Sequence, residues 1–330
     1  MRPFAFQKMN NAAEALKDKK AEAQFIAGGT NLVDLMKKHI AQPEALLDVS
    51  SALPKDIAVS GRGLLIGVMA RNTDLTLNKD ILARYPLVAR AVLAGASPQI
   101  RNMASVGGNL LQRTRCPYFY DVSTPCNKRK PNSGCGALHG AERMSAIVGY
   151  NAQCVTVHPS DLCVALAALD AEVKIMTREK KEKSISFRDF HKLPEATPWK
   201  DNTLPENALI THVYIPENPF HQHFAYLKLR DRTSYAFALV SVAAALHLEN
   251  GKITAARLAS GGVAHKPWRW YEAEEFLKGK APSAEVFAGA AERVVKGIKP
   301  LAGNAFKVPM LKGAVETALE NCITQESYKQ

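Results

Sequence analysis

The chain turns at Phe25-Ile26-Ala27-Gly28-Gly29-Thr30-Asn31-Leu32, and a second glycine-rich stretch follows at Ala104-Ser105-Val106-Gly107-Gly108-Asn109. In the first, glycines stand between an expected strand and an expected helix, so backbone N–H groups can converge on an anion near a favourable helix start. Neither stretch has the spaced glycines of a Rossmann turn or the lysine of a P-loop. A structural turn explains each Gly-Gly as readily as a ligand does, but two such loops in one domain suit a ligand that carries a pyrophosphate.

The pattern around these loops predicts short alternating strands and helices. We expect helices at 10–20, 32–39, 73–83, 86–94 and 161–170, and strands at 23–27, 45–49, 57–59, 64–67, 171–176 and 209–215. Residues 217–219 read as a linker. Beyond it we expect strands within 224–229, 238–248 and 253–260, a turn at Asn250-Gly251, and two closing amphipathic helices. At 330 residues, two domains are the default.

The net charge of +12 fits nucleic acid, a membrane surface, an acidic partner or an anionic ligand. No RNP, zinc-finger or helix-turn-helix signature accompanies it, so we expect no nucleic-acid partner. No apolar run is long enough to span a bilayer, so we expect no membrane partner. The N-terminus lacks an apolar signal core, which predicts no export signal on this chain. Part of the charge lies in one polar segment: Arg113, Arg115, Lys128, Arg129, Lys130 and Arg143.

The same segment holds four of the six cysteines: Cys116, Cys126, Cys135 and Cys154. They are separated by nine, eight and eighteen residues, gaps too wide for the paired knuckles of common zinc sites. Disulfides would need an oxidising compartment. An iron–sulfur cluster tolerates irregular spacing, and four thiolates complete its ligand set. On the residues alone, cluster, disulfides and zinc all stay open.

The remaining reactive side chains indicate no bond-breaking chemistry. Cys163 lies inside an expected apolar helix and reads as a small buried hydrophobe. Cys322 lies in the terminal helix, far from the other cysteines along the chain. The sequence shows no recognisable Ser-His-Asp or paired-carboxylate motif, so we assign no catalytic residue.

The motifs, in their order, resemble the FAD-binding subunits of the molybdenum hydroxylases, the xanthine dehydrogenase and aldehyde oxidoreductase group. The resemblance implies two flavin-pyrophosphate loops, with contacts from Ile26, Ala27, Gly28, Gly29, Thr30, Asn31 and Leu32, and from Ala104, Ser105, Gly107, Gly108 and Asn109. It also implies an acidic contact at Asp161, Ile210 near the isoalloxazine, and Lys228 beside the flavin. The resemblance covers essentially the whole chain.

The chain departs from most flavin subunits of the group by an insert at about 112–156, which contains the four clustered cysteines. This matches the sub-branch whose flavin subunit carries an extra [4Fe-4S] cluster, including bacterial periplasmic aldehyde oxidoreductases. The resemblance therefore implies that Cys116, Cys126, Cys135 and Cys154 ligate a [4Fe-4S] cluster.

The fold that the resemblance implies is α+β, with a two-part FAD-binding domain of the PCMH type and a smaller α/β domain after it. The expected boundaries are 1–218, divided into 1–54 and 55–218, and then 219–330. Separate chains would carry the molybdenum cofactor and the [2Fe-2S] centres. This chain would pass electrons from them, through FAD, to an external acceptor.

Three alternative functions stay open. One is the flavin subunit of a xanthine dehydrogenase-like or hydroxybenzoyl-CoA reductase-like enzyme. Another is a stand-alone NAD-linked flavoprotein, which would need an acid–base residue facing the flavin. A third is a zinc- or disulfide-stapled scaffold that binds partners through a basic face. For location, we expect the periplasm, reached by co-export with a signal-bearing partner subunit, with the cytoplasm as the alternative.

Overall fold

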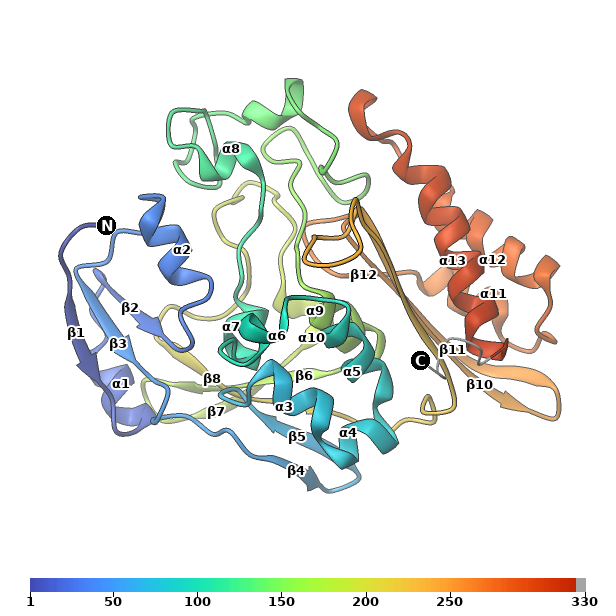
Figure 1. Cartoon of the computed structure of the whole chain (residues 1–330), viewed down its shortest axis with the longest axis horizontal. Coiled ribbons are helices and arrows are strands. Elements are labelled where there is room, and N and C mark those ends of the chain that lie inside the picture. Colours follow the sequence, from blue (N-terminus) through green and yellow to red (C-terminus); the bar gives the residue numbers. More distant parts are fainter. Residues whose placement is uncertain (325–330) are drawn as a thin grey trace.

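Three β-sheets follow one another along the molecule, as a computed structural model that describes residues 1–324 shows (Figure 1). The first sheet is parallel, with strand order β1-β3-β2. Its elements are β1 (Ala5–Lys8), α1 (Ala12–Asp18), β2 (Ala23–Ile26), α2 (Leu32–Lys37) and β3 (Ala45–Asp48). Helix α1 begins where Asn11 accepts a hydrogen bond from the Glu14 N–H.

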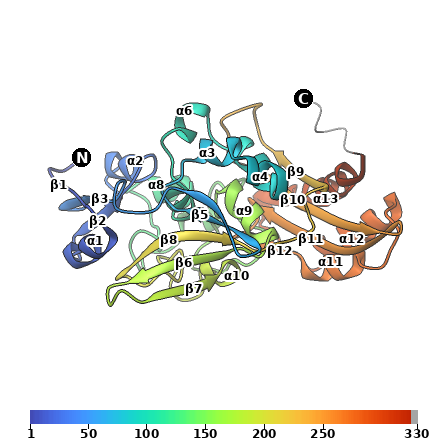
Figure 2. The ribbon, with the colours of Figure 1, turned by 90° about the horizontal axis from the view of Figure 1, so that it is seen from below.

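The second sheet is antiparallel, with strand order β4-β5-β8-β6-β7, and lies along the lower edge of the molecule in Figure 2. Its strands are β4 (Ile57–Ser60), β5 (Gly63–Gly67), β6 (Glu172–Thr177), β7 (Glu182–Ser186) and β8 (Ala208–Ile215). Between them run α3 (Asn72–Leu77), α4 (Lys79–Arg84), α5 (Pro86–Leu93), α6 (Pro98–Arg101), α7 (Val106–Leu110), α8 (Pro117–Tyr120), η1 (Gly136–His139), α9 (Asp161–Ala168) and α10 (Phe187–Phe190).

The third sheet is also antiparallel, with strand order β12-β11-β10-β9. Its elements are β9 (His223–Leu229), β10 (Val240–Glu249), β11 (Lys252–Gly261), β12 (Trp268–Arg269), α11 (Tyr271–Leu277), α12 (Ala284–Val295), η2 (Ala302–Asn304) and α13 (Lys307–Thr324). Asn250 and Gly251 both have positive φ, as a tight hairpin between β10 and β11 requires. The three helices cover the outer side of this sheet (Figure 1).

Helix α9 joins the second and third parts of the molecule. Each of its residues from Asp161 to Ala168 is buried, and it packs against α5, β10 and β11. Ser160 begins it by accepting a hydrogen bond from the Cys163 N–H. Because the helix is apolar all round, it can lie only in an interior, and it therefore holds Asp161 at a fixed place between the two sheets.

The mixed α+β class is confirmed, and several element boundaries differ from those expected. The helix expected at 73–83 is two helices, because the side chain of Asn78 accepts hydrogen bonds from Asp80 and Ile81 and starts α4 anew. Strands β1, β7 and β12 were not anticipated, and three helices rather than two follow β12. Within residues 1–324, no helix combines the length and apolar character that crossing a bilayer requires.

The buried side chain of Lys307 connects the start of α13 to two loops through hydrogen bonds. Lys307 is fully buried, and its Nζ donates to the carbonyls of Ser145, at 3.0 Å, and Gly262, at 2.9 Å. Asn304 donates to the carbonyls of Ser145 and Ala146 beside it. Burial, with a smaller contribution from Arg143, lowers the pKa of Lys307 to about 7.

We expect Lys307→Met to change how stability depends on pH. Between pH 7 and about 10.5 the unfolded lysine binds a proton that the folded one has lost, so in the wild type stability rises with pH in this window. The rise from this group approaches about 1.4 kcal/mol per pH unit. Thermal unfolding midpoints from pH 6 to 10 check it, and equal pH profiles in the variant and the wild type would contradict it.

Candidate functional site: two glycine loops between two cavities, beside a four-cysteine cage

The two glycine loops lie directly against each other, although about eighty residues separate them in the sequence. A Cβ built on Gly28 would lie 1.8 Å from the carbonyl oxygen of Met103, so no other residue fits there without moving the backbone. Asn31 donates from Nδ2 to the carbonyl of Gly108 at 3.3 Å. Gly29 has φ +71°, which glycine adopts without strain. The loops thus form one continuous glycine-rich surface.

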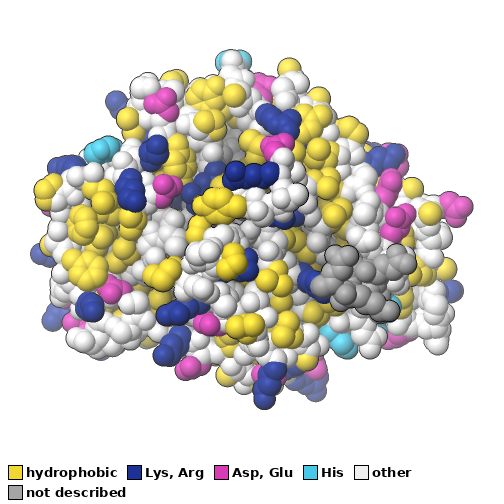
Figure 3. Space-filling view, in the orientation of Figure 1, with side chains coloured by type: hydrophobic (Ala, Val, Ile, Leu, Met, Phe, Trp, Pro, Cys, Tyr) yellow, Lys and Arg dark blue, Asp and Glu magenta, His cyan; other side chains and the backbone are white. Residues whose placement is uncertain are grey.

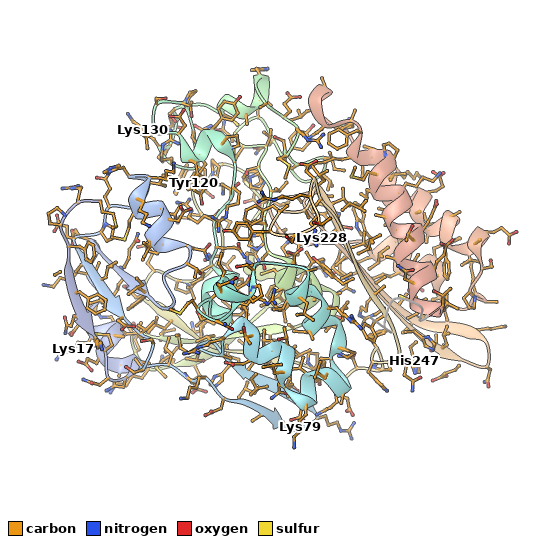
Figure 4. All side chains as sticks on the ribbon, in the orientation of Figure 1. Lys17, Lys79, Tyr120, Lys130, Lys228 and His247 are labelled. Carbon is orange, nitrogen blue, oxygen red and sulfur yellow. The ribbon has the colours of Figure 1, made fainter. Side chains whose placement is uncertain are left out.

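A cavity of about 780 Å³ opens on one side of this surface. The sequence-predicted residues that line it are Thr30, Asn31, Ala104, Asn109, Asp161 and Lys228. Figure 4 places Lys228 near the middle of the molecule, between the second and third sheets. Figure 3 shows Lys and Arg side chains gathered near the middle of this face, between α2 and the C-terminal helices. The cavity is large enough for a cofactor-sized ligand.

A second cavity, of about 440 Å³, lies on the other side of the loops. The sequence-predicted residues that line it are Ile26, Ala27, Gly28, Gly29, Thr30, Asn31, Leu32, Ser105, Gly107, Gly108 and Ile210. Thr30 and Asn31 line both cavities, so the two meet at the first loop. Every predicted cofactor contact therefore borders one cavity or the other.

The structure separates two residues that the sequence placed beside the same ring. Lys228 lines the larger cavity and Ile210 the smaller one. Ile210 comes from β8, in the second sheet, whereas Lys228 comes from β9, in the third. A ligand that reached both would have to cross the glycine loops.

A buried ion pair forms one wall of the larger cavity. The Lys228 ammonium lies 2.8 Å from Asp161 Oδ2 and also donates to the carbonyl of Ala94 at 3.0 Å. The Tyr226 hydroxyl donates to Asp161 Oδ1 at 2.7 Å. Burial, and then the Asp161 carboxylate, raise the pKa of Tyr226 well above its usual range, so it remains a hydroxyl. Both side chains of the ion pair are thereby fixed in position.

The four clustered cysteines come together although the segment between them has almost no regular structure. All four line one small cavity, together with Tyr118, Phe119 and Lys128. Cys126 and Cys135 face each other as an isolated antiparallel bridge. Cys116 and Thr156 line both this cavity and the 780 Å³ one, so the two spaces are neighbours. We call the four cysteines and the loop that carries them the cage.

Backbone N–H groups point at the cage sulfurs. Burial raises the pKa of Cys116 and the nearby N–H groups of Phe119 and Tyr118 oppose that rise, while those of Ala137 and Leu138 help to lower the pKa of Cys135. A hydrogen bond between the sulfurs of Cys135 and Cys154 lowers the pKa of Cys135 and raises that of Cys154. All six cysteines are free thiols. Donors of this kind stabilise thiolates that hold a metal cluster.

Several basic residues of the insert form ion pairs or hydrogen bonds around the cage. The Lys128 side chain is 3% exposed and lies 2.6 Å from Asp201, which Arg113 contacts at 2.7 Å. Burial alone would raise the pKa of Asp201, but these two cations lower it to about 2. Arg129 donates to the carbonyls of Tyr118 and Phe119. Arg143, by contrast, is largely exposed.

Sequence reasoning missed a pair of buried histidines behind the larger cavity. The rings of His158 and His191 lie 4.3 Å apart, and their ligand atoms lie within 4.8 Å of the Cys163 sulfur. Burial lowers the pKa of His191 to about 4 and that of His158 well below its usual value, so both rings are neutral. No sequence spacing connects these three residues; only the packing of α9 against α10 does. Cys163 and Cys322 are both buried, as expected.

Two known protein families match consecutive parts of this chain. Residues 3–218 match the FAD binding domain in molybdopterin dehydrogenase, and residues 224–321 match the CO dehydrogenase flavoprotein C-terminal domain. The aldehyde oxidoreductase FAD-binding subunit PaoB of Escherichia coli K12 is 44% identical over 330 residues, covering 98% of this chain and 100% of that protein.

More distant similarities extend along the whole chain. The glyceraldehyde dehydrogenase medium chain of Sulfolobus acidocaldarius is 25% identical over 90% of this chain and 89% of its own. The crystal structure of quinoline 2-oxidoreductase from Pseudomonas putida 86 matches with a TM-score of 0.75 over 99% of both chains, at 20% identity, which shows a shared fold. This chain belongs to the family of FAD-binding subunits of the molybdenum hydroxylases.

Proposed function

We propose that this chain is the FAD- and [4Fe-4S]-carrying electron-transfer subunit of a molybdenum-dependent aldehyde oxidoreductase. In this proposal it takes electrons from a molybdenum-cofactor subunit and a [2Fe-2S] subunit and passes them to an external acceptor. The main support for this proposal is that the four-cysteine cavity and the 780 Å³ cavity share a wall. Cys116 borders both the four-cysteine cavity and the large cavity beside the glycine loops. Two redox groups bound there would be neighbours.

The two cavities suit the two ends of FAD, with the diphosphate at Thr30 and Asn31, where they meet. The glycine surface lets the ligand approach the backbone closely, and a Cβ on Gly108 would meet only the Ser105 hydroxyl. We assign the isoalloxazine to the larger cavity, which Lys228 lines and Cys116 borders. The adenosine end then occupies the smaller cavity. Ile210 lines the smaller cavity, so this assignment of the two ends differs from the sequence-based expectation that Ile210 lies near the isoalloxazine.

FAD, when bound, supplies the chemistry of accepting and releasing electrons. The residues of this chain set its surroundings. Lys228 provides a buried positive charge that favours an anionic, reduced ring. Asp161 and Tyr226 hold that ammonium in one place. Neutral His158 borders the same cavity and adds no charge.

The cage suits an iron–sulfur cluster because four thiol donors surround one small space, lined with backbone N–H donors. Four thiol donors complete the ligand set of a [4Fe-4S] cluster, and the gaps between them in the sequence are wider than those of common zinc sites.

The partners of the proposal are subunits of the same complex. The relatives are medium subunits of multi-subunit molybdenum enzymes, which implies molybdenum and [2Fe-2S] partners. The edge strand β1 is exposed along its length and carries the exposed side chain Phe6, with Phe4 just before it. Exposed apolar edges of this kind commonly mark subunit contacts. The apolar side chains at the left of Figure 3 lie over this sheet.

The aldehyde assignment rests on the full-length relative at 44% identity, which is an aldehyde oxidoreductase subunit. For that reason we do not favour a xanthine dehydrogenase-like or hydroxybenzoyl-CoA reductase-like enzyme. For location we propose the periplasm, by co-export with a signal-bearing partner subunit. A fractionation experiment that found the assembled complex only in the cytoplasm would contradict this part of the proposal.

Gly28→Ala should lose FAD, because the new methyl group would displace the Met103 carbonyl and separate the two loops. The matched control is Gly313→Ala in α13, where a Cβ has no neighbour within 4 Å. Flavin absorbance per polypeptide should fall at least tenfold in the first variant and stay at the wild-type value in the second. Full flavin content in Gly28→Ala, with the variant folded, would contradict the assignment.

Cys126→Ala should lose iron and the broad visible band of an iron–sulfur cluster. The control is Cys322→Ala, which removes a thiol that is also buried but lies in α13, away from the cage. Iron and acid-labile sulfide per chain, measured after anaerobic purification, check the prediction. Four irons in the wild type support the proposal, whereas one zinc or no metal would overturn it.

Lys228→Met combined with Asp161→Asn should lower the flavin midpoint potential. The double change avoids leaving a buried carboxylate without its partner. The double change removes both charges of the pair, so the potential should fall only by the excess of the ammonium's effect over that of the carboxylate, on the order of tens of millivolts, since about 30 mV corresponds to 1.4 kcal/mol for two electrons. Redox titration of the bound flavin measures it, and an unchanged potential would remove Lys228 from the flavin site.

A further inference from the structure

Arg115 connects the cage to the first glycine loop. It is the residue directly before Cys116, yet its side chain reaches back across 84 positions to Asn31, where Nη2 donates to Oδ1. Its Nη1 donates to the Tyr120 hydroxyl at 2.8 Å and lies 3.4 Å from Asp34 Oδ2. Figure 4 shows Tyr120 between α8 and α2. One side chain thus contacts both cofactor regions.

The guanidinium of Arg115 still has an unused donor. Its Nε is buried and makes no hydrogen bond, and the residue lines the 780 Å³ cavity. A buried donor of a charged group that lacks a partner is costly, so an acceptor is expected at that point. The other cations of this cavity are engaged elsewhere: Lys228 with Asp161, and Arg232 with the carbonyl of Tyr235. The guanidinium of Arg115 contacts Asn31 where the residue lines the cavity, and the ligand chemistry that fits a cation at that point is an anion.

The position of Arg115 depends on the cage. The N–H of Cys116 donates to the Thr114 hydroxyl, and Thr114 in turn contacts the Thr156 hydroxyl, two residues beyond Cys154. Phe119 and Cys126 pack with Leu35 of α2 in one apolar cluster. Because these contacts orient both ends of the Arg115 bridge, a loosened cage would release the side chain from Asn31.

We propose that Arg115 binds the FAD diphosphate and makes FAD binding and cluster binding cooperative. This inference rests on the proposed function of the two cavities. A filled cage holds Arg115 against the first glycine loop, where its charge meets the dianionic diphosphate. Thermodynamic reciprocity then requires that bound FAD stabilises the cluster by the same factor.

The test compares FAD affinity in iron-loaded protein and in the same full-length chain after iron removal by a chelator. Flavin is first removed, and FAD is titrated back while its fluorescence is followed. Wild-type protein should bind FAD on the order of tenfold or more tightly when iron-loaded. In Arg115→Gln, the affinity of the iron-loaded form should fall on the order of tenfold to a hundredfold, and the difference between the two forms should disappear.

Two further variants separate the effect of the charge from that of the guanidinium geometry and provide a control. Arg115→Lys retains the charge without the planar fork, and should recover part of the affinity. Arg143→Gln removes an exposed arginine from the same insert and should match the wild type. Thermal melting shows whether each variant is folded. If a folded Arg115→Gln binds FAD as tightly as the wild type, the inference is overturned.

The outcomes also separate this inference from the function on which it rests. Wild-type protein that binds neither FAD nor iron would overturn the proposed function and the inference together. Wild-type protein that binds both, with equal FAD affinity before and after iron removal, would overturn the inference alone.

Discussion

The contact between Gly28 and the Met103 carbonyl holds the candidate site together. Because that contact leaves no room for a Cβ, the first loop lies flat against the second, and Asn31 can reach the Gly108 carbonyl. The two cavities exist on either side of this joined surface and meet at Thr30 and Asn31. If the loops were farther apart, the cavities would merge into an open groove and no single point would favour a diphosphate. The rest of the site therefore depends on one close backbone approach.

The cage has little regular structure of its own, and charged side chains give it rigidity. Lys128 and Arg113 both contact Asp201, which lies far along the chain beyond β7, and Arg129 donates to backbone carbonyls of α8. A buried carboxylate shared by two cations is stable only when all three groups are in place, since removing one leaves an uncompensated buried charge. These cations of the insert therefore stabilise the fold of the cage. The cage in turn fixes the position of Cys116 beside the larger cavity.

Local sequence signals were sufficient for the two loops, the cysteine group and most strands, because glycine pairs, clustered thiols and alternating apolar residues act over short distances. The break at Asn78 was missed because its signal is one capping side chain inside an otherwise periodic stretch. The two cavities were not separable from sequence, since Ile210 and Lys228 lie only eighteen residues apart yet belong to different sheets. The His158-His191 pair and the Arg115 bridge arise from tertiary packing alone.

An insert placed directly after the second glycine loop has a physical consequence for electron transfer. The chain leaves the loop at Asn109 and reaches Cys116 within seven residues, and it returns from Cys154 to His158 and Asp161 as quickly. Both ends of the insert therefore start at the wall of the larger cavity, so the insert can fold only beside it. Adjacency of the two proposed redox groups is thus a result of chain connectivity, and the Arg115 contact with Asn31 adds a direct link between them.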